Sequence, residues 1–468
     1  MAIRSVKEIL ARVVIGDMVE QGRCIARAGD LVLFVSQVAP GDVADLKIVS
    51  KKKGYAEAIP VYIHSTSHKR VQPFCQHFGV CGGCQWQHVS YTEQLAAKER
   101  LVLEKLVHIG RLRNPHVAPI LAAEHTVYYR NKLEFTFSTR RWLSEAEIKE
   151  PMQFDRSALG FHRPGYFDKV VKVTHCYLQP EPSNTIRNTL AQFAQAHALS
   201  FYDLRQHSGL LRNLIIRTTT TGEVMAIVQF GQAAADDIEQ VMHYLKTQFP
   251  QLTSLQYVVN TKKNETFYDL PVHLYHGQAF ITEQLGGLQF RIGPRSFFQT
   301  NTVQAQVLYK KIWELACLQH DEILYDLYTG VGSIAIFLAQ YAKHVVGIDV
   351  TEASIIDAQV NARLNGVFNT TFVAGEVEQL LDAQFFSTHG KPHVVVTDPP
   401  RAGMHPQVIK QLLRIAPERI IYVSCNPATQ ARDVALLSEQ YQLVTAQPID
   451  MFPHTSHVEN VVLLTRNS

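Results

Sequence analysis

The sequence predicts a multidomain α/β protein whose 468 residues divide into three parts. Short apolar runs separated by Gly, Asp and Pro turns predict an N-terminal, OB-like β-barrel over residues 1–66. Mixed strand and helix patterns predict a central α+β domain over residues 67–285. Over residues 286–468, strands alternate with helices, which is typical of a Rossmann-like sheet. A chain of this length is also too long for one ordinary core.

The composition permits nucleic-acid binding without requiring it. The formal net charge is +3, and 46% of the residues are hydrophobic, as in ordinary folded proteins. No stretch approaches the roughly 20 apolar residues of a spanning helix, and residues 1–7 lack the apolar core of a signal peptide. We therefore expect a cytoplasmic protein with no membrane partner. The sequence gives no indication of an obligate protein partner.

The N-terminal part contains short strand patterns at residues 11–15, 31–35 and 43–49. Gly, Asp and Pro turns separate them, as in small barrels. The third pattern runs into residues 51–55 (KKKGY), where basic side chains adjoin an aromatic ring. On a barrel face this pairing suits a phosphate backbone and a stacked base. The same residues are equally compatible with a solvated turn.

The central part combines a cysteine cluster with helix and strand patterns. A helix is predicted over residues 92–108, and residues 129–137 alternate as a half-buried strand does. Further strands are predicted at 214–217 and 224–228. This mixture indicates an α+β domain.

Four cysteines of the central part have the spacing of metal ligands. Cys75, Cys81 and Cys84 form a C-x5-C-x2-C pattern, and Cys176 follows much later. In a reducing compartment such spacing indicates metal or redox chemistry before disulfides. Four thiolates suit either a tetrahedral zinc ion or an iron–sulfur cluster, and the residues alone leave both open.

The C-terminal part alternates strands with helices and ends differently. Strands are predicted at 323–328, 345–349, 371–373, 393–398 and 420–424, and helices at 333–340, 352–364 and 407–415. This order predicts a doubly wound sheet. The last two strand patterns, 441–446 and 458–465, have no helix between them. Such an antiparallel addition is typical of methyltransferases.

A glycine-rich loop, residues 326–333 (DLYTGVGS), joins the first of these strands to the first helix. Its glycines allow a tight turn and the close approach of a ligand. Gly330 and Gly332 also fit the G-x-G-x-x-A form of a dinucleotide fingerprint, so the loop alone leaves a nicotinamide cofactor open. Asp349, at the end of the next strand, is placed to accept hydrogen bonds from the ribose hydroxyls of either cofactor.

Three features favour S-adenosylmethionine over a nicotinamide. They are the early Asp326, the terminal strand pair, and residues 398–401 (DPPR) at the carboxyl end of the fourth strand. The last motif resembles the Asp/Asn-Pro-Pro-aromatic signature of amino-group methyltransferases, whose aromatic ring stacks on a planar amine. Arg401 replaces that ring here, which argues against N-methylation.

Cys425 follows a buried strand pattern at the ligand edge of the sheet, beside Asp398 in the predicted strand order. An inert, buried cysteine is the ordinary alternative, and Cys24 and Cys317 are interpreted in that way. A thiolate is useful here because C5 of uracil becomes nucleophilic only after sulfur adds to C6. A base must then remove the C5 proton. Glu459, which opens the last strand on the same edge, is the candidate base.

The combined motifs resemble one family closely. In chain order they are residues 296–301, 326–332, 398–401, 424–427 and 457–460. Together they closely resemble the RNA uridine-5-methyltransferases, and the resemblance covers essentially the full length. It implies that the N-terminal barrel is a TRAM domain. It also implies that the cysteines of the central part hold a [4Fe-4S] cluster, with a structural role because methyl transfer moves no net electrons.

The resemblance also implies roles for individual residues. Cys425 would be the nucleophile, Glu459 the base, and Phe298 an aromatic support for the flipped target base. The residues implied to bind S-adenosylmethionine are Gln299, Tyr328, Asp349 and Asp398. The residues implied to ligate the cluster are Cys75, Cys81, Cys84 and Cys176.

Two positions depart from the family pattern. Ser333 stands where many relatives carry Asn, and Asp349 stands where relatives often carry Glu. Serine at position 333 makes a cofactor contact from that side chain less secure. Aspartate at position 349 has a shorter reach to the ribose than glutamate. Neither touches the reacting atoms.

The resemblance implies an RNA substrate whose target uridine leaves its stack. Ribosomal RNA, 23S in particular, is favoured, because barrel and cluster together are similar to the ribosomal enzymes of the family and are lacking in the compact bacterial transfer-RNA enzymes. A transfer-RNA uridine is the alternative. A catalytically inactive RNA-binding or iron-sensing protein is a weaker alternative, since the Cys, Glu and Asp set is intact.

Overall fold

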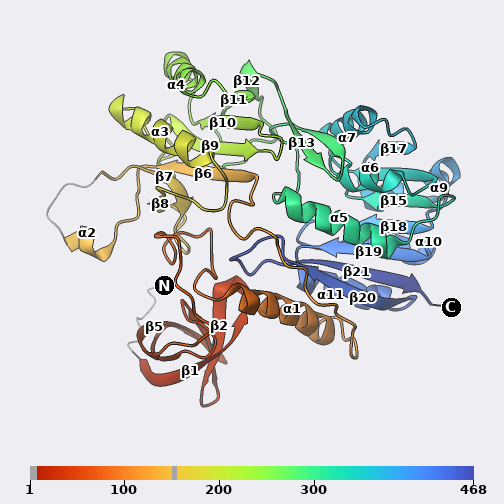
Figure 1. Ribbon diagram of the computed structural model, residues 1–468, viewed down its shortest axis with the longest axis horizontal. Helices are drawn as coiled ribbons and strands as arrows, with labels where there is room; N and C mark the ends of the chain where they lie inside the picture. Colours follow the sequence, from red (N-terminus) through yellow and green to blue (C-terminus); the bar gives the residue numbers. More distant parts are fainter. Residues whose placement is uncertain (1–7, 150–154, 468) are drawn as a thin grey trace.

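The computed structural model describes residues 8–149 and 155–467 of the chain. These residues form an N-terminal barrel, a central sheet with helices, and a larger C-terminal sheet with helices (Figure 1). Helices long and apolar enough to cross a membrane are absent from the described part of the chain. The expectation that residues 1–7 lack the apolar core of a signal peptide concerns residues outside the described part of the chain.

The predicted barrel is present. Its strands close in the order β1-β2-β3-β5-β4, and Leu33, Leu46 and Ile48 are fully buried inside it. β2 and β5 are additional to the predicted strands. In the turn after β4, the ammonium group of Lys52 lies 5.6 Å from the ring centroid of Tyr55. The strands are β1 (Ile9–Val19), β2 (Arg23–Ala28), β3 (Leu31–Ser36), β4 (Val43–Lys52) and β5 (Tyr55–Ser65), with a short 3₁₀ turn, η1 (Glu20–Gly22).

The central part is a seven-stranded sheet in the order β12-β11-β10-β9-β6-β7-β8. Alternate residues of its strands face different cores: Leu214 and Ile216 pack with the helices α3 and α4, whereas Ile215 joins the core of the C-terminal part. The central sheet is therefore buried on both faces at its middle. The elements are β6 (Lys132–Ser138), α2 (Glu145–Lys149), β7 (Ala158–His162), β8 (Val170–Lys172), α3 (Ser183–Ala196), β9 (Leu211–Thr218), β10 (Val224–Phe230), α4 (Ala235–Gln248), β11 (Ser254–Val259) and β12 (His273–Gly277).

The C-terminal sheet has the predicted doubly wound order, β17-β16-β15-β18-β19-β21-β20. The strands from β17 to β19 are parallel, whereas β21 and β20 are antiparallel additions. Its strands are β15 (Ile323–Leu327), β16 (His344–Asp349), β17 (Thr370–Ala374), β18 (Val394–Thr397), β19 (Arg419–Ser424), β20 (Tyr441–Ile449) and β21 (Glu459–Arg466). A separate hairpin, β13 (Ile281–Leu285) and β14 (Leu288–Ile292), precedes it.

Helices cover both faces of this sheet. Buried residues of α5, α6 and α7 share one core with the hairpin, and those of α8 to α11 share a second core on the opposite face. Hydrophobic burial of this kind is the main stabilising contribution to such a layered fold. The helices are α5 (Thr302–Ala316), α6 (Ser333–Ala339), α7 (Glu352–Leu364), α8 (Val377–Leu380), α9 (Ala383–His389), α10 (Pro406–Ile415) and α11 (Pro427–Leu437).

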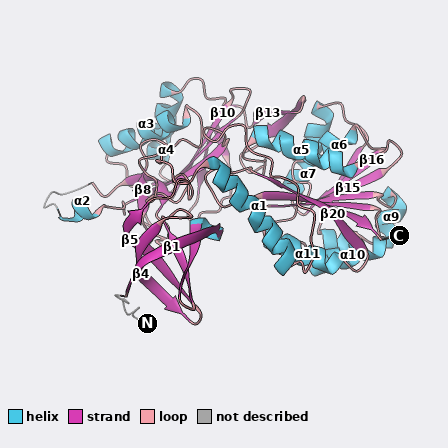
Figure 2. Ribbon diagram, turned by 60° about the horizontal axis from the view of Figure 1, so that its bottom comes forward, coloured by secondary structure: helices cyan, strands magenta, loops and turns pink. Residues whose placement is uncertain are grey.

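The long helix α1 (Tyr91–His108) links the cysteine segment to the C-terminal sheet. It runs beside α11 (Figure 2), and its Val102 and Leu106 join the core beneath α10 and α11. The chain after it continues along the outer edge of β20, where Val117 and Leu121 pair in parallel with Ala446 and Ile449. α1 and the segment 116–121 therefore pack as part of the C-terminal unit.

Candidate functional site

The carboxyl ends of the parallel strands bring the candidate residues to one edge of the C-terminal sheet. β16 ends at Asp349, and Tyr328 and Asp398 directly follow β15 and β18. Cys425 directly follows β19. Because these strands are neighbours in the sheet, the four positions lie in a row along its ligand-binding edge.

Glu459 reaches the same edge from the antiparallel strand β21. Ser424 of β19 pairs with Asn460 of β21. Cys425 follows Ser424, and Glu459 precedes Asn460, so the two side chains stand at the same end of adjacent strands. The structure thus brings the predicted nucleophile and the predicted base together, although 34 residues separate them in the sequence.

The glycine-rich loop has the backbone geometry of a ligand-binding turn. Gly332 has φ +77°, and a Cβ there would lie 2.9 Å from the Cβ of Ala358 and 3.0 Å from the ring of Phe372. Tyr328 has φ +65°, an unusual value for a residue with a side chain. Its ring packs with the core under α8 and α10, so the loop presents its backbone to the edge.

Two hydrogen bonds hold Asp349 against this loop. Its carboxylate accepts from the backbone N–H of Gly330 at 3.0 Å and from that of Thr351 at 2.8 Å. Apart from Gly330 and its two chain neighbours, no described residue has an atom within 4 Å of the position that a Cβ of Gly330 would occupy. The space in front of Gly330 is therefore open to a ligand, which fits the S-adenosylmethionine expected here.

Asp326 and Asp398 are carboxyls held in a poorly solvated setting. Burial raises the pKa of Asp326 to about 7 and that of Asp398 to about 7, and for Asp398 the nearby charge of Asp326 adds to the effect. One oxygen of Asp326 accepts from Thr329 Oγ1 at 2.6 Å and from the N–H of Ala335 at 3.1 Å. Its other oxygen is buried and lacks a partner among the described residues, so it can accept from a bound ligand.

Gln299 lies in the segment that leads into α5. It is buried, and its backbone oxygen accepts from the side-chain amide of Asn131, at the start of the central sheet, at 2.9 Å. Two residues further, Asn301 caps α5 by accepting from the N–H of Gln304 and donates to the carbonyl of Met451 at 3.1 Å. These bonds fix Gln299 between the central and the C-terminal sheets.

The charges around Cys425 oppose one another. The pKa of the Cys425 thiol is raised to about 11, first by burial and then by the negative charges of Glu459 and Asp398, and the guanidinium of Arg401 partly offsets this rise. Burial and Asp398 also raise the pKa of Glu459 well above its usual value, against the same guanidinium. Arg401 is thus the cation that favours the ionised forms of both the thiol and the carboxyl.

Several contacts hold Arg401 in place at the mouth of the site. Its Nη2 lies 3.2 Å from Nδ1 of His457. Its carbonyl accepts from Asn426 Nδ2 at 2.9 Å and from Thr429 Oγ1 at 3.2 Å. The residue is nevertheless exposed to solvent, so its guanidinium can also meet a substrate.

A cleft of about 610 Å³ opens between this edge and the central sheet. Phe297, whose exposed fraction is 66%, and the buried Phe298 contribute aromatic surface. Basic side chains line the remaining walls, which suits stacked bases and a phosphate backbone. These are Arg130, Lys132, Arg217 and Arg401.

The four candidate cluster ligands line a second cavity, which shares Phe161 and Leu178 with the cleft. Cys75, Cys81, Cys84 and Cys176 share it with apolar and aromatic neighbours that include Phe161 and Leu178. Burial raises the pKa of Cys81 and of Cys84 to about 12. The structure therefore brings together the thiols that the sequence predicts to act together.

A metal centre is nevertheless not shown. Among residues 8–149 and 155–467, no group of three or more His, Cys, Asp or Glu is arranged to hold a metal ion. The iron–sulfur site implied by the family resemblance therefore stays a prediction.

The remaining cysteines differ from the expectation in one case. Cys24 is buried in the barrel and donates to the carbonyl of Val38, as expected for an ordinary core thiol. Cys317, in contrast, is exposed, so the prediction that it is buried is wrong. It follows the last residue of α5 in a left-handed conformation, which turns it away from the core.

Comparison with known proteins decides the family. The sequence model of the family described as tRNA (uracil-5-)-methyltransferase matches residues 218–467. A protein of Bacteroides thetaiotaomicron named as an uncharacterized RNA methyltransferase is 49% identical over 451 residues, which cover 96% of this chain and 99% of that protein. This chain belongs to the RNA uracil-5-methyltransferase family. It is a methyltransferase that uses S-adenosylmethionine and acts on RNA.

Two further relatives extend the match over the whole methyltransferase. An RNA methyltransferase of Chlorobaculum tepidum is 39% identical and covers 99% of this chain and 98% of its own length. The crystal structure of the tRNA (uracil-54, C5)-methyltransferase of Pyrococcus abyssi, in complex with S-adenosyl-L-homocysteine, has a TM-score of 0.74 at 28% identity. The match covers 97% of this chain and all of that structure, so it includes the N-terminal barrel.

Two parts of the site escaped the sequence reasoning. Arg401 served there only as evidence against N-methylation, although a cation three residues beyond Asp398 must stand near the same edge. The basic wall of the cleft was also missed. Its signal was the alternation of Arg130, Lys132 and Glu134, which places three charged side chains on one face of a strand that was expected to be half-buried.

Proposed function

We propose that this methyltransferase forms a covalent bond between Cys425 and C6 of a uridine before C5 is methylated. The observation that carries the proposal is the row Asp398, Cys425, Glu459 at one edge of the sheet, with Arg401 beside it. An enzyme that methylates an amine needs no thiol at this place. A thiol flanked by a cation and a carboxyl suits nucleophilic attack followed by proton removal.

The thiolate of Cys425 adds to C6, and the electron pair displaced from the C5–C6 double bond makes C5 nucleophilic. Arg401 favours the thiolate by its charge. When bound, S-adenosylmethionine would supply the electrophilic methyl group that C5 attacks, and its remainder would leave as S-adenosylhomocysteine. The carboxylate of Glu459 then removes the proton from C5, the double bond re-forms, and the sulfur of Cys425 leaves as thiolate.

The setting of Glu459 agrees with a role as base. The residue is 3% exposed, and its raised pKa makes its ionised form a stronger proton acceptor than an exposed carboxylate. The positive charge of Arg401 lowers the pKa of Glu459 and so stabilises its ionised carboxylate. The carboxyl group therefore combines high basicity with a nearby charge that keeps part of it ionised.

Three of the residues proposed to bind the cofactor, Tyr328, Asp349 and Asp398, follow or end strands at this edge, and Gln299 precedes α5. Asp349 would bind the ribose, and the backbone at Tyr328 would line the cofactor site. Asp398 and Gln299 would hold the polar end of S-adenosylmethionine. The open space before Gly330 supports this arrangement. Phe298, in the cleft, would support the target base.

The proposal is tested by trapping the covalent intermediate. The Glu459→Gln protein, incubated with RNA and methyl-labelled S-adenosylmethionine, should accumulate a labelled protein–RNA adduct that migrates slowly on denaturing gels. Wild-type protein should show only labelled RNA. If the variant gives no adduct on an RNA that the wild type methylates, the assigned role of Glu459 is wrong.

For the substrate we propose a uridine of ribosomal RNA, 23S in particular. Support comes from the family resemblance of a chain that combines a barrel with four clustered cysteines, both of which are present here. A transfer-RNA uridine is the second candidate, favoured by the full-length similarity to the Pyrococcus abyssi tRNA enzyme. Mapping of 5-methyluridine in 23S and transfer RNA from a deletion strain separates the two, since only one RNA should lose the modification.

We also propose that Cys75, Cys81, Cys84 and Cys176 hold a [4Fe-4S] cluster with a structural role. Support comes from the four thiols that line one cavity and from the match of that donor set to cluster chemistry. Anaerobically purified protein should contain iron and acid-labile sulfide in equal amounts. Zinc without sulfide would establish the zinc alternative in its place.

The proposed division of labour follows the three parts of the chain. Residues 1–66, as a TRAM-like barrel, and residues 67–285 would bind RNA, and residues 286–468 would carry out methyl transfer. The basic and aromatic cleft between the central and C-terminal sheets supports it. A cytoplasmic location, where RNA and S-adenosylmethionine are both available, belongs to the same proposal.

A further inference from the structure

The segment between β20 and β21, residues 450–458, leads directly into Glu459 and carries His457, the neighbour of Arg401. Phe452, Thr455 and His457 of this segment line the cleft. Together with the pairing of Glu459 with Ile449 of β20, its position therefore sets where the proposed base stands. It is a turn without regular secondary structure, so contacts from other elements must hold it.

One such contact is a completely buried ion pair with α1. The ammonium group of Lys98 donates to Asp450 Oδ1 at 2.5 Å and to the carbonyl of Phe452 at 3.0 Å. Both side chains of the pair have an exposed fraction of 0%. The second oxygen of Asp450 accepts from the hydroxyl of Tyr91, also on α1, at 2.9 Å.

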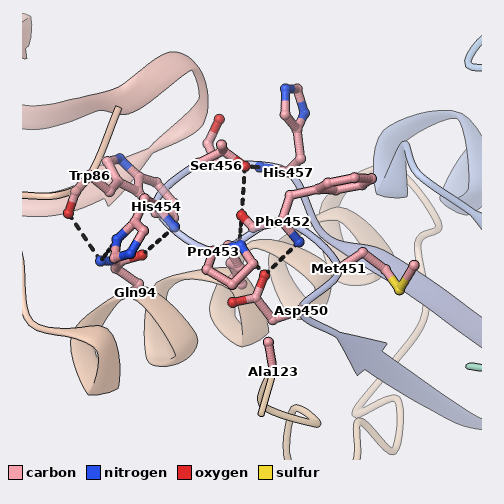
Figure 3. Close-up of polar contacts among 12 residues, drawn as sticks. Trp86, Gln94, Ala123, Asp450, Met451, Phe452, Pro453, His454, Ser456 and His457 are labelled. Atoms are coloured by element: carbon pink, nitrogen blue, oxygen red, sulfur yellow. Dashed lines mark hydrogen bonds and ion pairs between the residues drawn. The ribbon is translucent and has the colours of Figure 1, made fainter. Parts of the chain in front are cut away.

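A second contact comes from Gln94, one turn before Lys98 on the same helix. Its side-chain oxygen accepts from the N–H of His454 at 2.9 Å, and its amide nitrogen donates to the carbonyls of Trp86 and Val89. Gln94 is fully buried. Figure 3 shows part of the arrangement: dashed lines join Gln94 of the helix to Trp86 and His454, whereas His457 points away from the helix.

The segment before α1 adds a third attachment. The N–H groups of Gln85 and Trp86 both donate to the carbonyl of His454, at 2.8 and 3.0 Å. The side-chain oxygen of Gln85 accepts from the hydroxyl of Ser456 at 2.9 Å. Residues 85–98 therefore hold residues 450–456 at several points, immediately before the part that enters the site.

Close packing of α1 against the segment does not by itself require a buried ion pair or buried hydrogen bonds. A buried ion pair gains little over well-packed apolar residues of the same volume, whereas directional polar contacts define one geometry. Tyr91, Gln94 and Lys98 lie three and four residues apart, so one face of α1 presents all three. The polar contacts from this face of α1 fix the position of the segment, in addition to burying it.

We propose that Gln94 and Lys98 are positioning residues for the base: through Asp450 and His454 they fix residues 450–458 so that Glu459 reaches the C5 proton. The proposal rests on the function proposed above. Neither residue reacts with the substrate. Their loss acts on the step that Glu459 performs, the removal of the proton after methyl transfer, and leaves the addition of Cys425 to C6 intact.

The test is the double variant Lys98→Met/Asp450→Asn, which removes the ion pair without leaving a buried charge unpaired. With RNA and methyl-labelled S-adenosylmethionine, the covalent adduct should accumulate and product release should slow by about 10- to 100-fold, the scale of a misplaced catalytic group. Gln94→Ala provides a second variant that loses the attachment at His454 and keeps the ion pair. It should accumulate the adduct to a smaller extent.

The matched control is Arg100→Met, which removes an exposed ion pair between the same helix and Asp17 of the barrel. It should turn over like the wild type and accumulate no adduct. A merely structural role of Gln94 and Lys98 would lower product formation in proportion to the folded fraction measured by circular dichroism, without accumulation of the adduct. That result, or wild-type turnover in both variants, would overturn the proposal.

Failure of this proposal is distinguishable from failure of the proposed function. If Glu459→Gln accumulates the adduct and the two α1 variants do not, Glu459 is the base and α1 does not position it. If Glu459→Gln itself gives no adduct, the assignment of the base fails, and the positioning proposal falls with it.

Discussion

Two groups of cysteines in the same molecule show how surroundings determine what a thiol does. Cys425 stands at the edge of a sheet beside Arg401 and Glu459, next to a cleft that a substrate can enter. The cysteines of the central part face one another in an apolar cavity. Burial raises the pKa of thiols in both places. The difference lies in the neighbours: a guanidinium and a carboxyl flank the thiol proposed to react, whereas the four thiols proposed as ligands face one another.

The largest effect should come from Cys425→Ala. Loss of the only group proposed to bond to C6 should abolish both turnover and adduct formation, a decrease of at least about 10⁴-fold, because the nucleophile acts as a unit with its partners. A methylation assay with 5-methyluridine analysis measures it. Methylation at the wild-type rate by this variant would remove the distinction between the reactive and the ligating thiols.

Arg401→Met should have the next largest effect and should depend on pH. The reaction needs the thiolate, and the pKa of Cys425, about 11, already includes the lowering by Arg401. Without the guanidinium the pKa rises further, so activity near neutral pH should fall by about tenfold for each unit of the rise. The increase of rate with pH should shift to higher pH. Arg401→Lys, which keeps the charge, should recover part of the activity.

Cys84→Ser should have a smaller effect on the reaction and a large one on metal content. Iron and sulfide should be lost from the purified protein, and thermal stability should decrease because a ligand of the proposed cluster is gone. Turnover of the protein that remains folded should fall by less than about tenfold, since this cysteine does not contact the reacting atoms. A loss of turnover as complete as that of Cys425→Ala would contradict the separation of roles.

Cys24→Ala should have the smallest effect. The thiol is buried in the barrel and makes one hydrogen bond, to the carbonyl of Val38 at 3.3 Å. Its loss should lower the free energy of unfolding by about 1 kcal/mol, through a small cavity and one weak bond. Activity and iron content should not change. Denaturant titration and the methylation assay give both values.

The fold of the C-terminal part was largely predictable, because its strands are short apolar runs that alternate with periodic helices. β5 was not, since Pro60 interrupts it and apolar residues such as Val61 face the solvent. The order of motifs located Cys425 and Glu459 at one edge, because parallel strands end at the same side of a sheet. The placement of these two residues at one edge relied on rules that relate sequence to sheet geometry.

The attachment of α1 could not be predicted in this way. Lys98 and Asp450 are 352 residues apart, and a charged residue in an amphipathic helix is ordinarily expected on the solvent side. Gln94 and His454 are likewise joined only in the folded chain. Such contacts depend on how separate parts pack together, and a pattern within one segment carries no information about them.

The chain that follows α1 along β20 has a practical consequence for work with fragments. Backbone hydrogen bonds from Ala118 and Leu121 occupy the outer edge of that strand. A fragment that starts at residue 286 would leave this edge bare, and an unpaired strand edge is a template for self-association. A fragment of the methyl-transfer unit that stays monomeric must therefore include residues 90–123, joined to it by a linker or supplied as a second chain.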